Sequence, residues 1–251
     1  MTVTYDGLAV EWLGYATVRL EGDRVVYLDP GRYGVLTGEW EPDSPAAAGA
    51  HPPGQDYRRG DADLVCLSHV HHYDDDGLER VSGDGTTVLA FEGIDPRDSG
   101  RDLPRLSELP YDVREVSMED GAVAADLPVW TVPAYNEPGG PHTTADGTPF
   151  HPEGLGCGFL VSFEGTTVFW PGDTDVLEGH AELDVDVFLP PIGGAFTMDR
   201  REAAALAERL EPELVVPIHY NTFEALETDS AAFAADCRER GLEVALDEGG
   251  E

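Results

Sequence analysis

The sequence contains no lysine: its 15 basic residues are all arginine, against 50 aspartates and glutamates, for a formal net charge of -35. No basic stripe or cluster is visible, so the chain is not expected to bind nucleic acid or an anionic membrane surface. A surface this acidic repels itself in dilute buffer, whereas concentrated salt screens the charges within a few ångströms. The charge therefore indicates adaptation to a salt-rich cytosol, as in a halophile, rather than a functional patch.

Cysteine and long hydrophobic runs are also scarce. The three cysteines, Cys66, Cys157 and Cys237, are odd in number and widely spaced, which argues against a disulfide framework or a zinc finger. No stretch approaches the roughly 18 apolar residues of a membrane span, and the first residues lack the basic start and apolar run of a signal peptide. We therefore expect a soluble, cytoplasmic protein without a membrane partner.

The apolar residues that are present form many short runs. With 251 residues, of which 41% are hydrophobic, the chain suffices for one domain over residues 1–251. β-Branched runs bounded by glycine and proline predict strands. They lie within residues 8–14, 17–22, 24–31, 63–70, 86–91, 124–134, 157–163, 166–172, 185–191, 213–219 and 242–246.

Helical patterns are fewer. In residues 199–212, Asp199 and Glu202 have the spacing of a capping box before an amphipathic run. Residues 229–241 predict a second helix, which Gly241 is placed to end. A shorter third helix is expected to start at Gly77. Many strands with few helices indicate packed sheets that are covered by helices.

The stretch LSHVHHYDDDGLERV, residues 67–81, holds three of the eight histidines and three aspartates. Neutral imidazole and carboxylate are the groups that bind divalent transition ions. Asp173 and His219 likewise follow apolar strands, and His151 precedes one. Because strand ends hold side chains rigidly, we interpret the four positions as a metal site. The alternative is a solvated loop in an acidic protein.

Eight stretches, in this order, resemble the metallo-β-lactamase fold hydrolases: VEWLGYATVRLEG, VVYLDPG, LSHVHHYDDDGL, VPAYN, FHPEGLGCGF, WPGDTDVL, LPPIGGAFTMD and VVPIHYNT. The resemblance is closest to the branch that includes the ascorbate-lactonase-like proteins. It implies an α+β fold, a four-layer αββα sandwich with a metal site between the sheet edges. It also implies two ions, most often zinc and sometimes iron or manganese.

The resemblance also implies the ligands. His69 and His71 match the paired histidines of the family's His-x-His-x-Asp-His motif, and His151 resembles the third histidine of the first ion. Asp173 resembles the carboxylate that bridges both ions, and His219 the last ligand of the second. In an extended segment residues i and i+2 share a side, so His69 and His71 would hold one ion together. A water on such an ion has its pKa lowered to about 7, which makes hydroxide available.

The chain departs from the motif after His71, where the family's aspartate–histidine pair is replaced by Tyr73 and Asp74. A one-residue insertion makes Asp74 the expected aspartate, acting on the hydroxide, and puts Asp75 in the place of the second-ion histidine. A shifted register instead makes His72 a ligand. We favour the insertion. In either register the second site would be richer in oxygen than usual, which favours manganese or iron(II) there.

Other polar residues carry weaker predictions. Tyr15 stands where the related branch commonly has histidine, and it either lines the pocket or packs. Asn136 either orients substrate or packs. Surface positions are expected for His51, His142 and His180. The long loops 40–61 and 135–150 are expected to rim the site.

Together these features predict a metal-dependent hydrolase that acts on a small-molecule substrate, with Asp74 and Asp173 as catalytic carboxylates. A small lactone or ester is the substrate that the branch similarity suggests. A phosphodiesterase of the same fold is the alternative among enzymes. A metal-binding or regulatory protein without turnover is the alternative outside them, because the His-x-His motif is altered.

Overall fold

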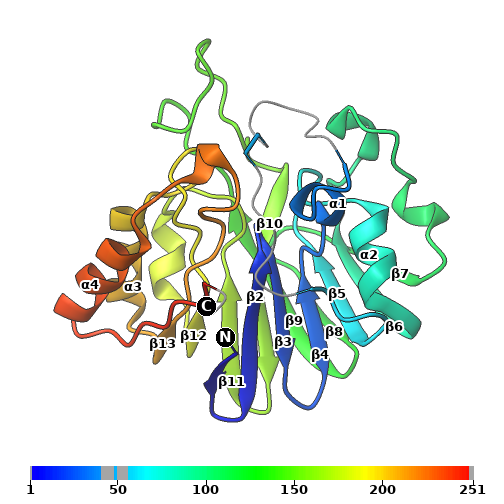
Figure 1. Cartoon of the computed structure of the whole chain (residues 1–251), viewed down its shortest axis with the longest axis horizontal. Helices are drawn as coiled ribbons and strands as arrows, with labels where there is room; N and C mark the ends of the chain where they lie inside the picture. The colour runs from blue at the N-terminus through cyan, green and yellow to red at the C-terminus, as the bar shows by residue number, and fades with distance from the viewer. Residues whose placement is uncertain (1, 41–47, 50–55, 249–251) are drawn as a thin grey trace.

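The strands form two mixed sheets in a computed structural model that describes residues 2–40, 48–49 and 56–248 (Figure 1). The first sheet has seven strands in chain order: β1 Val3–Tyr5, β2 Leu8–Gly14, β3 Thr17–Glu21, β4 Val25–Leu28, β5 Ala62–Leu67, β6 Ser82–Phe91 and β7 Asp112–Val116. The second sheet has six, ordered from edge to edge: β13 Leu214–Val215, β12 Val187–Phe188, β11 Thr166–Trp170, β10 Gly156–Phe163, β9 Leu127–Ala134 and β8 Gly121–Ala124.

Each sheet is antiparallel in one half and parallel in the other. Strands β1 to β4 pair antiparallel through short turns, and β4 to β7 pair parallel. The second sheet repeats this plan, with β8 to β11 antiparallel and β11 to β13 parallel. Parallel neighbours need longer crossover connections than antiparallel ones.

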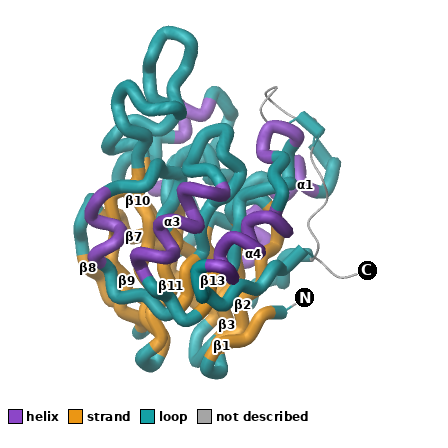
Figure 2. The backbone as a smooth tube through the Cα atoms, turned by 90° about the vertical axis from the view of Figure 1, so that its left-hand side faces the viewer, coloured by secondary structure: helices purple, strands orange, loops and turns teal. Residues whose placement is uncertain are grey.

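Helices cover the outer face of each sheet. Helices α1 (Tyr33–Leu36) and α2 (Asp75–Val81) lie beside the first sheet, and α3 (Arg200–Leu210) and α4 (Ser230–Glu239) beside the second (Figures 1 and 2). The predicted capping box of α3 is confirmed: Asp199 accepts from the backbone N–H of Glu202, whose side chain accepts from the N–H of Asp199.

The core lies between the sheets. Val18 and Leu64 from the first sheet and Phe159 and Val168 from the second belong to one cluster of buried side chains. Removal of an apolar side chain of this size from water stabilises the fold by about 1.5–3 kcal/mol. The layers therefore follow the order helix, sheet, sheet, helix, and the predicted αββα sandwich is confirmed.

Several element predictions need correction. Residues 242–246 form no strand, only an isolated bridge between Val244 and Val215. The third helix starts at Asp75 rather than Gly77, because Asp74 caps it. Strands β1, β7 and β8 were not predicted: they are short or largely exposed, so their sequences lack a clear apolar pattern. His51 and most of the loop 40–61 lie outside the described residues.

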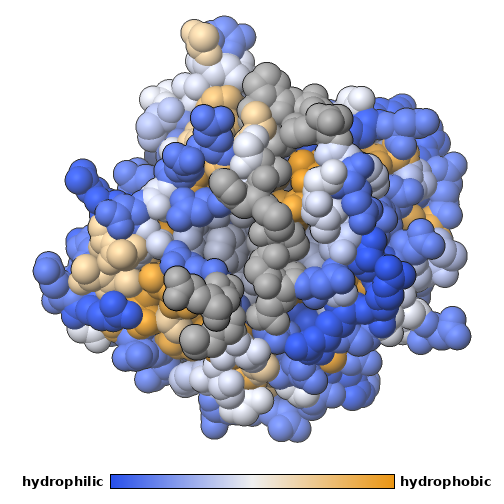
Figure 3. Space-filling model, viewed as in Figure 1, coloured by the Kyte–Doolittle hydropathy of each residue, from blue (hydrophilic) through white to orange (hydrophobic). Residues whose placement is uncertain are grey.

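The surface is largely polar, as Figure 3 shows for one face. Cys66, Cys157 and Cys237 are buried and free. Among the described residues, no helix combines the length and the apolar character that crossing a membrane would need.

Candidate metal centre

Chain segments from both sheets meet at one end of the sandwich. His69 follows β5, Asp173 follows β11, His219 follows β13, and His151 precedes β10. An isolated antiparallel bridge pairs His69 with Gly156, the first residue of β10. A Cβ at Gly156 would lie 2.7 Å from the Cβ of His69, so only glycine permits this approach. Residues that are far apart in sequence are thereby brought together.

Four imidazole rings surround the carboxylate of Asp173. Its Oδ2 lies 3.3 Å from Nε2 of His151, 3.5 Å from Nε2 of His72 and 3.7 Å from Nε2 of His69. Its Oδ1 lies 3.4 Å from Nε2 of His219. These five side chains are almost fully buried. The structure thus brings together four of the sequence-predicted ligands, and adds His72.

His71 completes what we call the His–Asp cluster, which comprises His69, His71, His72, His151, Asp173 and His219. Its Nδ1 lies 3.2 Å from Nε2 of His151, and its side chain is exposed. Donor atoms of His69, His71 and His151 lie within 4.8 Å of one another, as do those of His69, His72 and Asp173. The cluster therefore contains two overlapping groups of ligand type.

The backbone turns within residues 69–73, where an extended segment was assumed. The N–H of His72 donates to the carbonyl of His69 at 3.3 Å, and that of Tyr73 to Val70 at the same distance. Such a turn places residues i and i+3 on one side. His72 therefore joins His69 beside Asp173, as in the shifted register rather than the insertion that we favoured.

Asp74 and Asp75 lie outside both ligand groups. Asp74 is the N-cap of α2: its carboxylate accepts from the N–H of Gly77 at 2.8 Å and from the N–H of Arg32. Burial raises the pKa of Asp74 to about 6. Asp75 is the first residue of α2 and is half-buried. The first backbone N–H groups of a helix lack partners within the helix, and a carboxylate often accepts from them. In α2 that carboxylate is Asp74.

A different carboxylate supports His72. Asp29, at the end of β4, accepts from Ser68 through its N–H at 2.7 Å and its hydroxyl at 2.6 Å, and from Nε1 of Trp170 at 2.9 Å. Its Oδ2 lies 3.1 Å from Nδ1 of His72. Asp29 adopts φ 46°, a strained backbone conformation for a residue with a side chain. This contact turns Nε2 of His72 toward Asp173.

The histidines of the first ligand group are held neutral. Burial lowers the pKa of His151 to about 4 and lowers that of His69 well below its ordinary value. Desolvation by the neighbouring protein atoms also lowers the pKa of His71, although one side of its ring reaches solvent. A neutral imidazole is the form that binds a metal ion. At neutral pH, protons therefore compete little for these nitrogens.

Asp173 and His72 shift each other's pKa in opposite directions. Burial opposes a charge on Asp173, but the nearby His219 and His72 hold the pKa of its carboxyl well below the ordinary range. Burial opposes a charge on His72 as well, but Asp173 and Asp29 raise its pKa. Asp173 is thus a carboxylate, the form that binds a cation.

The cluster passes a test for metal binding that depends on its own atoms. Among the described residues, several of its buried polar atoms have no hydrogen-bond partner: Nε2 of His69 and His72, both ring nitrogens of His219, and Oδ1 of Asp173. Each unpaired buried group costs about 1–3 kcal/mol. A divalent cation beside Asp173 would satisfy the atoms that face it, Nε2 of the three histidines and Oδ1 of Asp173, so the residues fit a metal ion.

Tyr15 packs against the cluster. Its ring lies 4.8 Å from that of His72 and 4.6 Å from that of His219, centre to centre. Its carbonyl accepts from the N–H of His219, and both residues have positive φ, 51° and 56°. Strained backbone of this kind often marks functional positions. Tyr15 both packs and borders the cluster.

The sequence interpretation missed the burial of two histidines, and it left the role of Asn136 open between orienting substrate and packing. His142 and His180 are 5% and 1% exposed, so the predicted surface positions are wrong. His180 has Nε2 2.8 Å from the carbonyl of Pro133. Asn136 is buried, and its side chain accepts from the N–H of His151 at 2.8 Å. No local pattern distinguishes these residues in the sequence, because their partners are remote.

Comparisons with known proteins agree with this fold. The profile of the beta-lactamase superfamily domain matches residues 9–219. A UPF0173 metal-dependent hydrolase of Thermococcus kodakarensis is 31% identical over 249 residues, covering 96% of this chain and 97% of that protein. Another, of Pyrococcus horikoshii, is 34% identical and covers 89% of each.

Solved structures show the same fold. A putative metal-dependent hydrolase of Parabacteroides distasonis has a TM-score of 0.72 at 20% identity, with 98% of this chain and 97% of that chain covered. The metallo hydrolase Igni18 of Ignicoccus hospitalis has a TM-score of 0.68 at 23% identity, with 97% and 96% covered. The extent of the profile match and the identity to these relatives show that the chain belongs to the metallo-β-lactamase superfamily, in the UPF0173 family of metal-dependent hydrolases.

Proposed function

We propose that the chain hydrolyses a small lactone or related ester at the His–Asp cluster, with two divalent ions bound there. The observation that carries this proposal is the convergence of buried, unsatisfied imidazole nitrogens on the single carboxylate of Asp173. The lactone class rests on the similarity of the sequence motifs to the ascorbate-lactonase-like branch.

The two ligand groups, with His219 added because its Nε2 lies 3.4 Å from Asp173, suggest how the ions divide when His69 is assigned to the first. His69, His71 and His151 would hold one ion, and His72, His219 and Asp173 the other, with Asp173 near both. Bound ions supply a Lewis acid and lower the pKa of water to about 7. The first group, all imidazole, favours zinc, whereas two imidazoles and one carboxylate in the second suit zinc or iron(II). The expected oxygen-rich second site has lost its basis, because Asp74 and Asp75 lie elsewhere.

The chain's own residues would orient the reactants. Asp173 presents a buried carboxylate that would fix the direction of a nucleophile. Asp29 holds the ring of His72, and the Ser68 hydroxyl holds that of His69 through Nδ1 at 2.9 Å. Tyr15 limits access beside His72 and His219. Such fixed geometry around a reacting group lowers the cost of orienting it.

The test is metal analysis of the purified protein in high salt, together with lactone, thioester and phosphodiester substrates. We expect bound zinc and lactone turnover that chelation abolishes and zinc restores. His180→Ala is a matched control, since it removes a buried histidine outside the cluster. Turnover of phosphodiesters alone would refute the lactone assignment. Bound metal without any turnover would indicate a binding protein, and absence of metal binding would refute the site.

The acidic surface we attribute to a salt-rich cytosol. With a net charge of -35, self-repulsion should destabilise the folded state as screening is withdrawn. The Debye length grows from about 3 Å at 1 M salt to about 30 Å at 0.01 M. We expect the melting temperature to fall by about 10 °C or more over this range, since 1 kcal/mol corresponds to about 2–4 °C at this length. A melting temperature indifferent to salt would refute this assignment.

We also propose a cytoplasmic location and a small-molecule substrate, without nucleic-acid or membrane partners. Three buried cysteines without disulfides suit a reducing compartment. The scarcity of basic residues disfavours polyanionic partners.

A further inference from the structure

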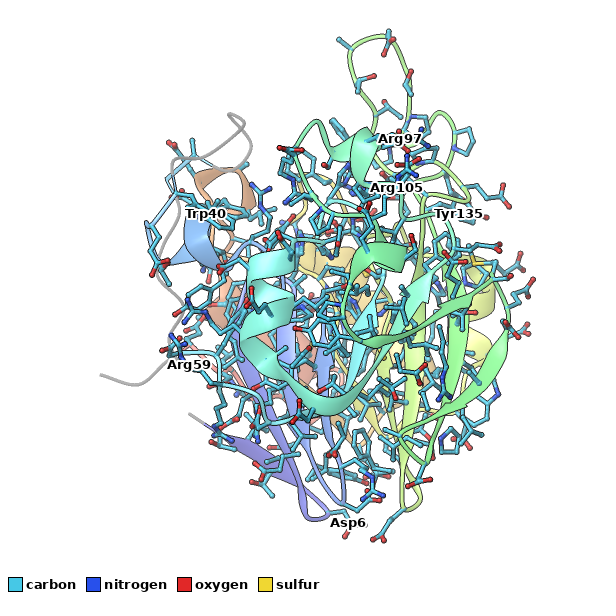
Figure 4. All side chains as sticks on the ribbon, turned by 90° about the vertical axis from the view of Figure 1, so that its right-hand side faces the viewer. Asp6, Trp40, Arg59, Arg97, Arg105 and Tyr135 are labelled. Carbon is cyan, nitrogen blue, oxygen red and sulfur yellow. The ribbon has the colours of Figure 1, made fainter. Side chains whose placement is uncertain are left out.

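Residues 142–150 fold back on themselves as a hairpin beside the cluster. Thr143 pairs with Pro149 in an isolated antiparallel bridge, and the N–H of Phe150 donates to the carbonyl of His142 at 3.1 Å. The hairpin therefore has His142 at the start of one arm, and the cluster residue His151 directly after the other. Tyr135, which directly follows β9, lies at the opposite end of the molecule from Asp6 (Figure 4).

His142 is fixed at both ring nitrogens. Its Nδ1 contacts Oδ1 of Asp175 in a short hydrogen bond, and its Nε2 lies 3.1 Å from the carbonyl of Gly194. A carboxylate and a carbonyl only accept, so both nitrogens donate. The hairpin is thereby joined to the loops that follow β11 and β12. Asp175 lies two residues after Asp173 of the cluster.

Asp175 in turn contacts Asn136. Its Oδ1 accepts from Nδ2 of Asn136 at 3.0 Å, and its Oδ2 accepts from the N–H of Glu137 at 2.8 Å. Nδ2 of Asn136 also donates to the carbonyl of Phe196 at 3.0 Å. With both amide protons engaged, Asn136 has one orientation, and its Oδ1 is directed elsewhere.

That oxygen holds His151. Oδ1 of Asn136 accepts from the N–H of His151 at 2.8 Å and lies 3.3 Å from its Nδ1, and the carbonyl of Phe196 also lies 3.3 Å from Nδ1. Two acceptors around Nδ1 place its proton there. The lone pair of Nε2 is then directed at the cluster, 3.3 Å from Asp173.

From this chain of contacts we infer that His142 is a positioning residue for the metal centre: through Asp175 and Asn136 it fixes the ring and tautomer of His151. The inference rests on the metal site of the proposed function. Groups that orient a metal ligand typically change metal affinity by about 10–100-fold when they are removed. His142 would touch neither ion nor substrate.

The experiment measures zinc dissociation constants by chelator competition in high salt, for the full chain and its variants. His142→Ala removes the hydrogen bonds from the ring to Asp175 and to Gly194. Asp175→Asn replaces one accepting oxygen of the carboxylate by an amide NH2 group. His180→Ala is the control. His180 is also buried, but among the described residues its ring nitrogens hydrogen-bond to Pro133 and Leu177 and to no residue of the cluster. Melting temperatures without metal are recorded for all of them, and visible spectra with cobalt in place of zinc.

We expect His142→Ala and Asp175→Asn to weaken zinc binding by about 10–100-fold and to change the cobalt spectrum. His180→Ala should lower the melting temperature, because it removes a buried side chain. It should leave the zinc affinity within about twofold of that of the unmodified chain, because it removes no contact to the cluster. His142→Gln, which keeps one donor toward Asp175, should recover part of the affinity and replaces His142→Ala if that variant does not fold.

Two failures are distinguishable. An unmodified chain that binds no zinc refutes the proposed function and this inference with it. If the unmodified chain binds zinc and the His142 and Asp175 variants bind it equally well, only the positioning role is refuted. Equal weakening in His180→Ala would refute it too, because the effect would then follow from lost stability.

Discussion

The histidines and the aspartates of residues 69–76 are neighbours in sequence but serve different structures. His69, His71 and His72 face the cluster, whereas Asp74 caps helix α2 and Asp75 begins it. Both residue types suit a metal ion, so residue type alone does not separate them. The difference comes from the backbone. A turn at residues 69–73 directs the rings of His69 and His72 toward Asp173. The start of α2 then binds the carboxylate of Asp74 through the N–H of Gly77.

The largest effect is expected from His69→Ala combined with His71→Ala. His69 belongs to both ligand groups and His71 to one, so the pair removes donors from each. We expect bound zinc to fall by at least about one ion per chain and turnover to be lost, because an ion needs three or four protein ligands. Metal analysis and circular dichroism check this. Full metal occupancy with an intact fold would contradict the cluster.

How far the sequence predicts this site depends on the range of each interaction. The strand ends that carry His69, Asp173 and His219 follow from apolar runs, and the start of α3 follows from Asp199. These are local signals. The position of His72 depends on a turn that its histidine-rich sequence does not specify.

The residues that support the cluster, Asp29 and His142, could not be predicted from the sequence for a similar reason. Asp29 reaches Trp170 from 141 positions away, and His142 reaches Asp175 from 33. Their polar side chains are buried only because the completed fold supplies partners. Composition made surface positions the natural expectation for His142 and His180, and tertiary contacts overrode it.

A comparison of His72→Ala with Asp75→Ala sharpens the contrast within the segment. His72 lies 3.5 Å from Asp173, whereas Asp75 belongs to neither ligand group. We expect His72→Ala to lose about one ion per chain, or to bind it far more weakly, and Asp75→Ala to keep full metal content. Metal analysis of both variants decides the register. Metal loss in Asp75→Ala, with none in His72→Ala, would restore the insertion.

The smallest effect is expected at Asp74, and it should appear in stability rather than in metal content. Asp74→Ala removes the acceptor for the N–H groups of Gly77 and Arg32 at the start of α2. Loss of an N-cap costs about 0.5–2 kcal/mol of unfolding free energy, and Asp74→Asn should cost less because its amide oxygen still accepts from Gly77. Denaturant unfolding in high salt measures both.

Metal analysis of the same two variants completes the comparison. Asp74 is absent from both ligand groups, so zinc stoichiometry should equal that of the unmodified chain. If Asp74→Asn instead kept its stability and lost metal, the carboxylate would be acting at the metal centre rather than at the helix. The division between histidines and aspartates would then be wrong, and the turn at residues 69–73 would not decide which side chains reach the cluster.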